Sequence, residues 1–150
     1  MAKPTALSEQ ALQLDHQLCF ALYSASLAMT KLYKPLLDSL QLTYPQYLVM
    51  LVLWEEDGLT VSALGERLHL DSGTLTPLLK RLEAVGWIAR QRSTKDERRV
   101  HVVLTPAGVA LKARAAEIPG CVVKATGCTI PNLMSLTRQV NDLRDRIATA

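Results

Sequence analysis

Residues 71–104 of this 150-residue chain decide its fold: DSGTLTPLLKRLEAVGWIARQRSTKDERRVHVVL. The first residue of the stretch can cap a helix that begins near Ser72 and ends at Gly86, with leucines at helical spacing between them. Two short apolar strands, near residues 87–90 and 100–104, flank a loop dense in Arg and Lys. The order of helix, strand, basic loop and strand predicts a winged helix-turn-helix.

Positive charge is concentrated in the same stretch. The chain has a formal net charge of +3, yet the residues before Arg90 carry 6 basic and 9 acidic side chains. The next ten residues hold two acids, Asp96 and Glu97, and five cations, which are Arg90, Arg92, Lys95, Arg98 and Arg99. A solvated charged loop is one interpretation. The cap, helix, glycine and strand that precede it favour contact with the phosphates of double-stranded DNA.

The bulk composition indicates one globular domain. With 49% hydrophobic and 21% charged residues, the chain can bury a substantial core. Its longest apolar run, residues 47–54, falls well short of the roughly 20 residues that cross a bilayer. The first ten residues lack the apolar core of a signal peptide, so we expect a cytoplasmic protein. The odd count of 3 Cys argues against a closed disulfide framework and favours reduced or redox-active thiols.

Helical patterns flank the decisive stretch on both sides. Residues 8–40 predict a helix that Pro35 kinks or divides, and its leucines exceed what one buried stripe needs. Further helices are expected to begin at residues that can cap them: Thr43, Thr60, Thr105 and Thr129. The helix after Thr105 should be disturbed near Pro119-Gly120.

The predicted fold class is mainly α with a small β-hairpin wing. We expect a single domain over residues 1–150. In it, dimerisation helices at about 8–40 and 106–150 flank a winged-helix DNA-binding core at about 43–104. Terminal helices outside a DNA-binding core need somewhere to bury their leucines, and a second copy of the chain would serve.

The candidate DNA contacts lie on the wing and on the helix expected from Ser72 to Gly86, which we call the recognition helix. With the leucines facing inward, hydroxyls and cations point outward or lie near the boundary: Ser72, Thr74, Thr76, Lys80 and Arg81. A helix N-terminus in the major groove offers N–H groups to phosphate and small side chains to base edges. An arginine at the wing tip can enter the minor groove, with a nearby Asp holding its guanidinium group.

The cysteines admit two interpretations. Cys19, between Leu18 and Phe20, could be a small buried hydrophobe. Alternatively it is a sensor thiol, because a phenol can donate a hydrogen bond to a thiolate and so make it oxidisable. Cys121 and Cys128 lie near predicted helix breaks, where either could attack a sulfenic acid on Cys19 to form a disulfide.

Four segments carry a resemblance to a known family: LCFALYSA, LTYPQYLVMLVLWE, LGERLHLDSGTLTPLLKRLE and DERRVHVVLTPAG. The chain resembles the MarR family over residues 14–147. Within that family it is similar to the organic-hydroperoxide-sensing repressors called OhrR. The DERR wing is generic to MarR proteins, whereas the Cys19 segment combined with LTYPQY and LDSGTLTPLLKRLE is much more specific.

The resemblance implies a homodimer that binds a palindromic operator, represses a peroxidase gene and is released when organic hydroperoxides oxidise an N-terminal cysteine. By motif match, Cys19 is that cysteine. Tyr33 and Tyr44 match tyrosines that hydrogen-bond it across the dimer. Asp96 and Arg98 match the wing pair that reaches the minor groove.

The resolving thiol stays open. Some members of the family use a second cysteine in the C-terminal part of the partner subunit, and Lys124 stands where some relatives would have it. We favour Cys121, because the adjacent Pro-Gly can loosen the backbone, and Cys128 is its rival. A small cellular thiol is the third alternative.

Two other functions remain to be distinguished. One is a MarR-type repressor released by a small phenolic or aromatic ligand, with Cys19 in the core. The other is a thiol peroxidase. The sequence argues against it, because His16 is the only Arg or His near Cys19 that could stabilise a leaving alkoxide. His16, His69 and His101 are scattered, so we expect no metal site; we also expect no cofactor and no enzymatic activity.

Overall fold

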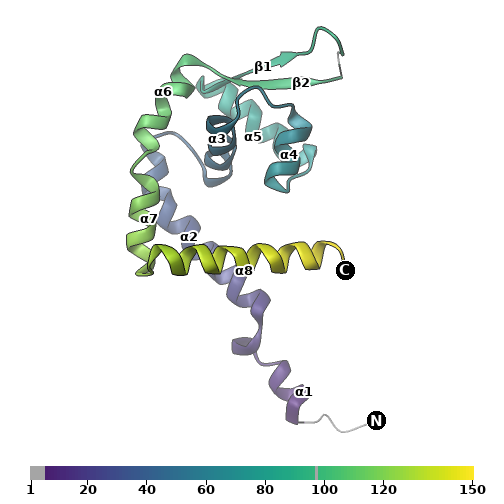
Figure 1. Cartoon of the computed structure of the whole chain (residues 1–150), viewed down its shortest axis with the longest axis vertical. Coiled ribbons are helices and arrows are strands. Elements are labelled where there is room, and N and C mark those ends of the chain that lie inside the picture. The colour runs from purple at the N-terminus through teal and green to yellow at the C-terminus, as the bar shows by residue number, and fades with distance from the viewer. Residues whose placement is uncertain (1–5, 97) are drawn as a thin grey trace.

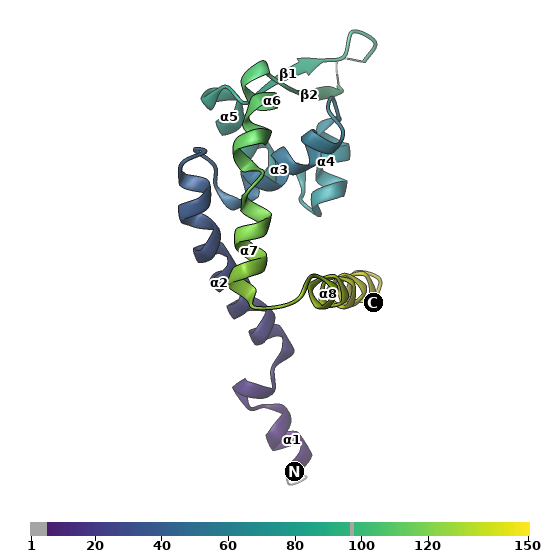
Figure 2. The ribbon, with the colours of Figure 1, turned by 60° about the vertical axis from the view of Figure 1, so that its left-hand side comes forward.

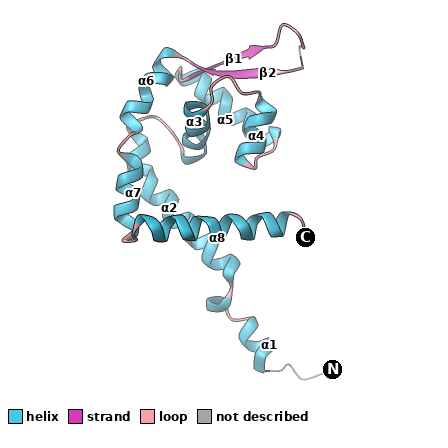
Figure 3. Cartoon of the chain, viewed as in Figure 1, coloured by secondary structure: helices cyan, strands magenta, loops and turns pink. Residues whose placement is uncertain are grey.

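The computed structural model describes residues 6–96 and 98–150, so Glu97 of the wing lies outside it. Figures 1 and 3 show helices with one small hairpin. The elements in chain order are α1 (Ala6–Ala11), a short 3-10 helix η1 (Leu14–His16), α2 (Leu18–Asp38), α3 (Tyr44–Glu55), α4 (Val61–Leu68), α5 (Ser72–Val85), β1 (Ile88–Arg92), β2 (Val100–Leu104), α6 (Pro106–Ala115), α7 (Ile118–Thr126) and α8 (Ile130–Ala148).

Side-chain caps start the helices where the sequence predicts them. Each cap oxygen accepts a hydrogen bond from the backbone N–H three residues later, which satisfies one of the helix's unpaired donors. Thr43 also receives a return bond: its own N–H donates to Gln46 Oε1 at 2.9 Å, forming a capping box. The capping residues are Thr43, Thr60, Asp71, Thr105 and Thr129, so these five predicted helix starts are confirmed.

The winged-helix core packs α3, α4 and α5 beneath the hairpin (Figure 1). β1 and β2 pair antiparallel, with Ile88 opposite Leu104. The buried leucines of α4 and α5 meet the apolar face of the hairpin, where Ile88 and Val102 are buried. Such side chains contribute about 1.5–3 kcal/mol each when fully removed from water. The helix-turn-helix is close-packed: a Cβ on Gly65 would meet the Leu70 carbonyl oxygen at 2.7 Å.

The N-terminal helix divides at a different place from the one predicted. α2 runs through Pro35 to Asp38, whereas residues 12–17 interrupt the helix. Pro35 lies near the end of α2 on an exposed face, where water can satisfy the one carbonyl that it deprives of a donor. Instead of capping α2, the Gln17 amide donates to the carbonyls of Ala11 and Gln13. The prediction of a division at Pro35 was wrong.

The C-terminal helices extend away from the core. α6 ends at Ala115 and α7 starts at Ile118 with Pro119 in its first turn, which confirms the expected disturbance. Figure 2 shows α7 beside α2, with α8 projecting end-on. α8 has no buried residue. In the described part of the chain, no helix is both long and apolar enough to cross a membrane.

Candidate DNA-binding surface and redox centre

The recognition helix α5 presents its first turn to solvent. Asp71 Oδ1 accepts the N–H of Thr74 at 2.7 Å, and this bonding lowers the pKa of the Asp71 carboxyl below its ordinary value. Ser72 and Thr74 are exposed, whereas Thr76 is half-buried and its hydroxyl donates to the Ser72 carbonyl at 2.7 Å. Lys80 and Arg81, further along α5, are both exposed as well.

A groove joins the recognition helix to the wing. Its volume is about 660 Å³. Ser72 and Thr76 of α5 line it together with Arg98 and Arg99 of the wing and Glu66 of α4. The fold therefore brings hydroxyls and cations that are more than twenty residues apart in sequence onto one concave surface.

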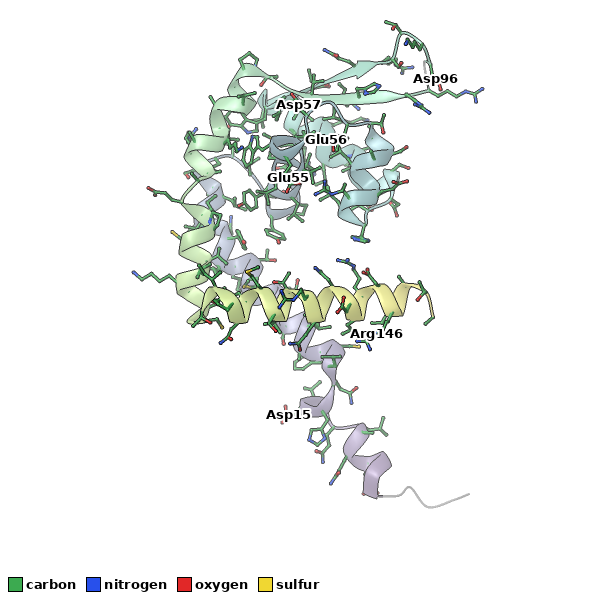
Figure 4. All side chains as sticks on the ribbon, viewed as in Figure 1. Asp15, Glu55, Glu56, Asp57, Asp96 and Arg146 are labelled. Carbon is green, nitrogen blue, oxygen red and sulfur yellow. The ribbon has the colours of Figure 1, made fainter. Side chains whose placement is uncertain are left out.

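The wing tip is organised by Asp96, which Figure 4 labels at the end of the hairpin. Its carboxylate accepts the backbone N–H of Arg98 at 3.0 Å, and its carbonyl accepts the N–H of Arg99 at 3.0 Å. The Arg99 guanidinium is 3.9 Å from the Asp96 carboxylate. Asp96 thus shapes the backbone of the turn, and the guanidinium group that its carboxylate approaches is that of Arg99.

Arg90 differs from the other candidate DNA contacts. It lies on β1 and forms an ion pair with Glu83 of α5, with Nη2 3.2 Å from Oε1. Its backbone N–H donates to Glu83 Oε2 at 3.0 Å. Arg92, two residues along β1, is exposed.

Cys19 lies in the first turn of α2 and is exposed in a single chain. The sequence placed it inside a longer helix, so its position at a helix N-terminus was missed. The interrupted residues 12–17 create that position. Tyr23, one turn later, is also exposed.

Three tyrosines form a cluster at the other end of α2. The ring centroids of Tyr33 and Tyr44 are 4.8 Å apart, those of Tyr33 and Tyr47 5.7 Å, and those of Tyr44 and Tyr47 6.4 Å. Burial raises the pKa of Tyr33 to about 12, with repulsion from Tyr44 and Tyr47 adding to the shift. Burial likewise raises the pKa of Tyr44 and of Tyr47. All three phenols therefore keep their protons at neutral pH and can act as donors.

Tyr47 also belongs to this cluster, although the resemblance indicates only Tyr33 and Tyr44 for the redox centre. Only 3% of it is exposed, and its ring packs behind the other two. The signal available in the sequence was its spacing of three residues from Tyr44, which puts both on one face of a helix.

Cys121 and Cys128 lie at the two ends of α7, and both are exposed. Cys121 is in the first turn of α7, where its N–H donates to the Glu117 carbonyl. Cys128 follows Gly127, whose φ of 66° ends the helix, and its thiol approaches the Thr126 carbonyl at 3.5 Å. The expectation that both thiols lie where helices break is confirmed. Among the described residues, no group of three His, Cys, Asp or Glu side chains could hold a metal ion.

Comparison with known proteins places these features among transcriptional regulators. A family model described as transcriptional regulator SarA/Rot matches residues 31–114. The organic hydroperoxide resistance transcriptional regulator of Bacillus subtilis is 57% identical over 112 residues, covering 75% of this chain and 76% of the relative.

Solved structures agree with that result. Reduced AbfR bound to DNA superposes with a TM-score of 0.80 at 31% identity, over 95% of this chain and 99% of that one. Disulfide-formed AbfR has a TM-score of 0.65 at 34% identity, over 91% and 96% of the two chains. The present structure is thus more similar to reduced, DNA-bound AbfR than to disulfide-formed AbfR.

Proposed function

The chain belongs to the MarR-like SarA/Rot family of winged-helix transcriptional regulators, and we propose that it is a dimeric repressor controlled by oxidation of Cys19. In the reduced state, α5 and the wing hold operator DNA. An organic hydroperoxide oxidises Cys19, and the repressor releases the operator.

The observation that carries the proposal is the separation of the thiol from the phenols within one chain. Cys19 and Tyr33 lie on the same helix, fourteen residues apart, so their Cα atoms are about 21 Å apart at 1.5 Å per residue. In the described part of the chain, the hydroxyls of Tyr33, Tyr44 and Tyr47 donate no hydrogen bond to a protein acceptor, and burial raises the pKa of all three phenols, so they stay protonated. A second chain packed against α2 would supply its Cys19 as the missing acceptor, which makes the centre a property of the dimer.

Unpartnered apolar surface supports such a dimer. The first half of α2 exposes Leu18, Leu22 and Leu27, and α8 exposes further apolar side chains: Ile130, Met134, Leu136, Val140 and Ile147. Residues of α8 and Leu22 of α2 line an apolar groove of about 310 Å³. Apolar surface of this extent on a regulator is typical of a subunit interface.

The dimer also accounts for the DNA-binding residues. Two recognition helices can enter successive major grooves, about 34–36 Å apart, on a palindromic operator. Ser72, Thr74 and Thr76 lie at the N-terminal end of α5, where they would face base edges. Five cations further from that helix end would contact the DNA phosphates or enter the minor groove: Lys80, Arg81, Arg92, Arg98 and Arg99.

The chemistry of sensing needs only the thiol, the phenols and the hydroperoxide. The Cys19 thiolate attacks the terminal oxygen of the hydroperoxide, so an S–O bond forms as the O–O bond breaks. The sulfur loses two electrons and becomes a sulfenic acid, while the organic group leaves as an alkoxide and takes a proton to become an alcohol. Phenol donors would stabilise both the thiolate and the departing alkoxide, and apolar neighbours such as Leu18 and Phe20 favour organic over hydrogen peroxide.

The second step joins the sulfenic acid to another thiol, giving a disulfide and water. Cys121 is the favoured partner, because Pro119 and Gly120 precede it in the first turn of α7 and can loosen the backbone there. Cys128 remains its rival and a small thiol the third alternative. A disulfide between Cys19 and any of these thiols would change the packing around α2, and therefore the distance between the two recognition helices of the dimer.

The proposal is tested with a DNA duplex selected from a random library by the reduced protein. Treatment with cumene hydroperoxide should release the wild-type protein from this duplex and modify Cys19, as seen by mass spectrometry. Cys19→Ser should bind equally well and ignore the peroxide, because Ser keeps the approximate size and removes the nucleophile. Release of Cys19→Ser by the peroxide, or release of the wild type by salicylate without oxidation, would favour another inducer.

A further inference from the structure

One ion pair connects the recognition helix directly to the wing. Glu83 lies in the last turn of α5, and Arg90 lies in the middle of β1. Three hydrogen bonds link them: the Arg90 backbone N–H to Oε2 at 3.0 Å, Nε to Oε2 at 3.4 Å, and Nη2 to Oε1 at 3.2 Å. Both carboxylate oxygens of Glu83 therefore accept bonds from a single residue of the hairpin.

These bonds close the corner between helix and strand. At that corner Gly86 has a φ of 99°, and its N–H donates to the carbonyls of Leu82 and Glu83 at 3.1 Å. Two further bonds act at the turn itself, from the Trp87 N–H to the Leu82 carbonyl at 3.1 Å and from the Thr105 hydroxyl to the Gly86 carbonyl at 2.6 Å. The bonds from Glu83 to Arg90 tie the strand to the helix beyond the corner.

The Arg90 side chain is also less exposed to solvent than that of Arg99, which can reach DNA phosphates from the wing tip. Its side chain is 29% exposed, against 70% for Arg99 at the wing tip. It lines the groove between α5 and the wing, and it shares a second hollow of about 270 Å³ with Glu83. The hydrogen bonds from Arg90 lower the pKa of the Glu83 carboxyl, so Glu83 carries its negative charge at neutral pH.

We propose that Glu83 and Arg90 form a clamp that sets the angle between the recognition helix and the wing, and that Arg90 is a positioning residue for DNA binding. The inference rests on the proposed DNA-binding function. A winged helix must place its helix in the major groove and its wing tip at a neighbouring groove at the same time. If the angle between α5 and β1 changed, the helix and the wing tip could not both keep their contacts with the DNA.

The sign of the effect of removing Glu83 separates a clamp from simple electrostatics. Loss of an acid from a DNA-facing surface should strengthen binding if only charge matters. The clamp predicts the opposite: Glu83→Ala should weaken binding of the selected duplex about tenfold, equivalent to the loss of one charge-assisted hydrogen-bonding partner. Glu83→Gln keeps an acceptor oxygen and should fall between Glu83→Ala and the wild type.

Glu66 provides the control, because it is an exposed acid on the α4 wall of the groove that Arg90 lines, and it does not touch Arg90 in the described structure. Glu66→Ala should strengthen binding, as charge alone predicts. Thermal unfolding of each variant, measured without DNA, should stay close to the wild type, because a single ion pair that water still reaches contributes little to global stability.

The salt dependence of binding separates positioning from phosphate contact at Arg90. Arg90→Ala should weaken binding while leaving the slope of log K against log salt at the wild-type value. A phosphate contact would lower that slope by about one unit. The double variant Glu83→Ala, Arg90→Ala should bind no more weakly than either single variant, because each already opens the clamp.

Three results would overturn the clamp: tighter or unchanged binding by Glu83→Ala, a reduced salt slope for Arg90→Ala, or single-variant losses that multiply in the double variant. Failure of the DNA-binding function itself would show differently, since the wild-type protein would then select no duplex from the library.

Discussion

The rings of Tyr33 and Tyr44 lie with their centroids 4.8 Å apart, although Tyr33 belongs to α2 and Tyr44 begins α3. Tyr47 packs against both from the interior. The cluster therefore holds two phenols from different helices side by side, at a site that the Cys19 of the same chain cannot reach along α2.

Tyr33→Phe and Tyr44→Phe should each slow the oxidation of Cys19 without abolishing it. Each change removes a phenol donor and keeps the ring, so packing in the cluster survives. A hydrogen bond to a charged group is worth about 1.5–3 kcal/mol, which corresponds to roughly 10- to 100-fold in rate if the whole bond acts in the transition state. Stopped-flow measurement with cumene hydroperoxide would test this, and unchanged rates in both variants would show that the phenols do not activate Cys19.

Tyrosine ionisation should be delayed in the folded protein. Because burial raises the pKa of Tyr33 to about 12, its phenolate should form only at strongly alkaline pH, well above the ordinary value of 10.0. A raised folded-state pKa stabilises the fold below pH 10, and this contribution is lost as pH rises toward 12. A spectrophotometric titration of the phenolate band should show this late step. The step should disappear in Tyr33→Phe, and its persistence there would assign it to another tyrosine.

Arg98→Ala should weaken DNA binding substantially and lower the salt slope by about one unit, if the side chain neutralises one phosphate-equivalent charge. The fold should stay intact, because Arg98 is exposed and the wing turn depends on its backbone N–H, which alanine retains. Fluorescence anisotropy over a salt series would measure both quantities. A slope equal to that of the wild type would remove Arg98 from the set of electrostatic contacts.

The oxidised dimer should carry an intersubunit disulfide from Cys19 to Cys121, visible as a covalent dimer on a non-reducing gel. A disulfide needs Cα atoms roughly 4.4–6.8 Å apart, so the N-terminal end of α7 would have to approach the partner's α2. Cys121→Ser should lose the covalent dimer and Cys128→Ser should retain it.

The matched pair of serine variants distinguishes the alternatives. The reverse pattern would transfer the resolving role to Cys128, and a covalent dimer in both variants would mean that either thiol serves. A wild-type protein that forms no covalent dimer, but carries a mixed disulfide on Cys19, would use a small thiol instead.

The sequence by itself determined the starts of five helices and the wing. Thr43, Thr60, Asp71, Thr105 and Thr129 each cap the helix that they were expected to begin, and Gly86 ends α5 in the left-handed conformation. These features depend on hydrogen bonds that span three or four residues, so the residue type at each position is enough to indicate them. The leucine spacing of α5 and the concentration of cations in the wing are equally local.

Only the tertiary structure decided how the candidate sites are built. Cys19 lies in the first turn of α2 because the helix is interrupted before Leu18, where the Gln17 side chain bonds to the preceding turn. Tyr47 joins Tyr33 because α2 and α3 pack together, and Arg90 faces Glu83 because the corner at Gly86 folds β1 back along α5. Helical periodicity shows which side of a helix is buried. It does not show which element will lie against that side, because that choice depends on how all the elements pack at once.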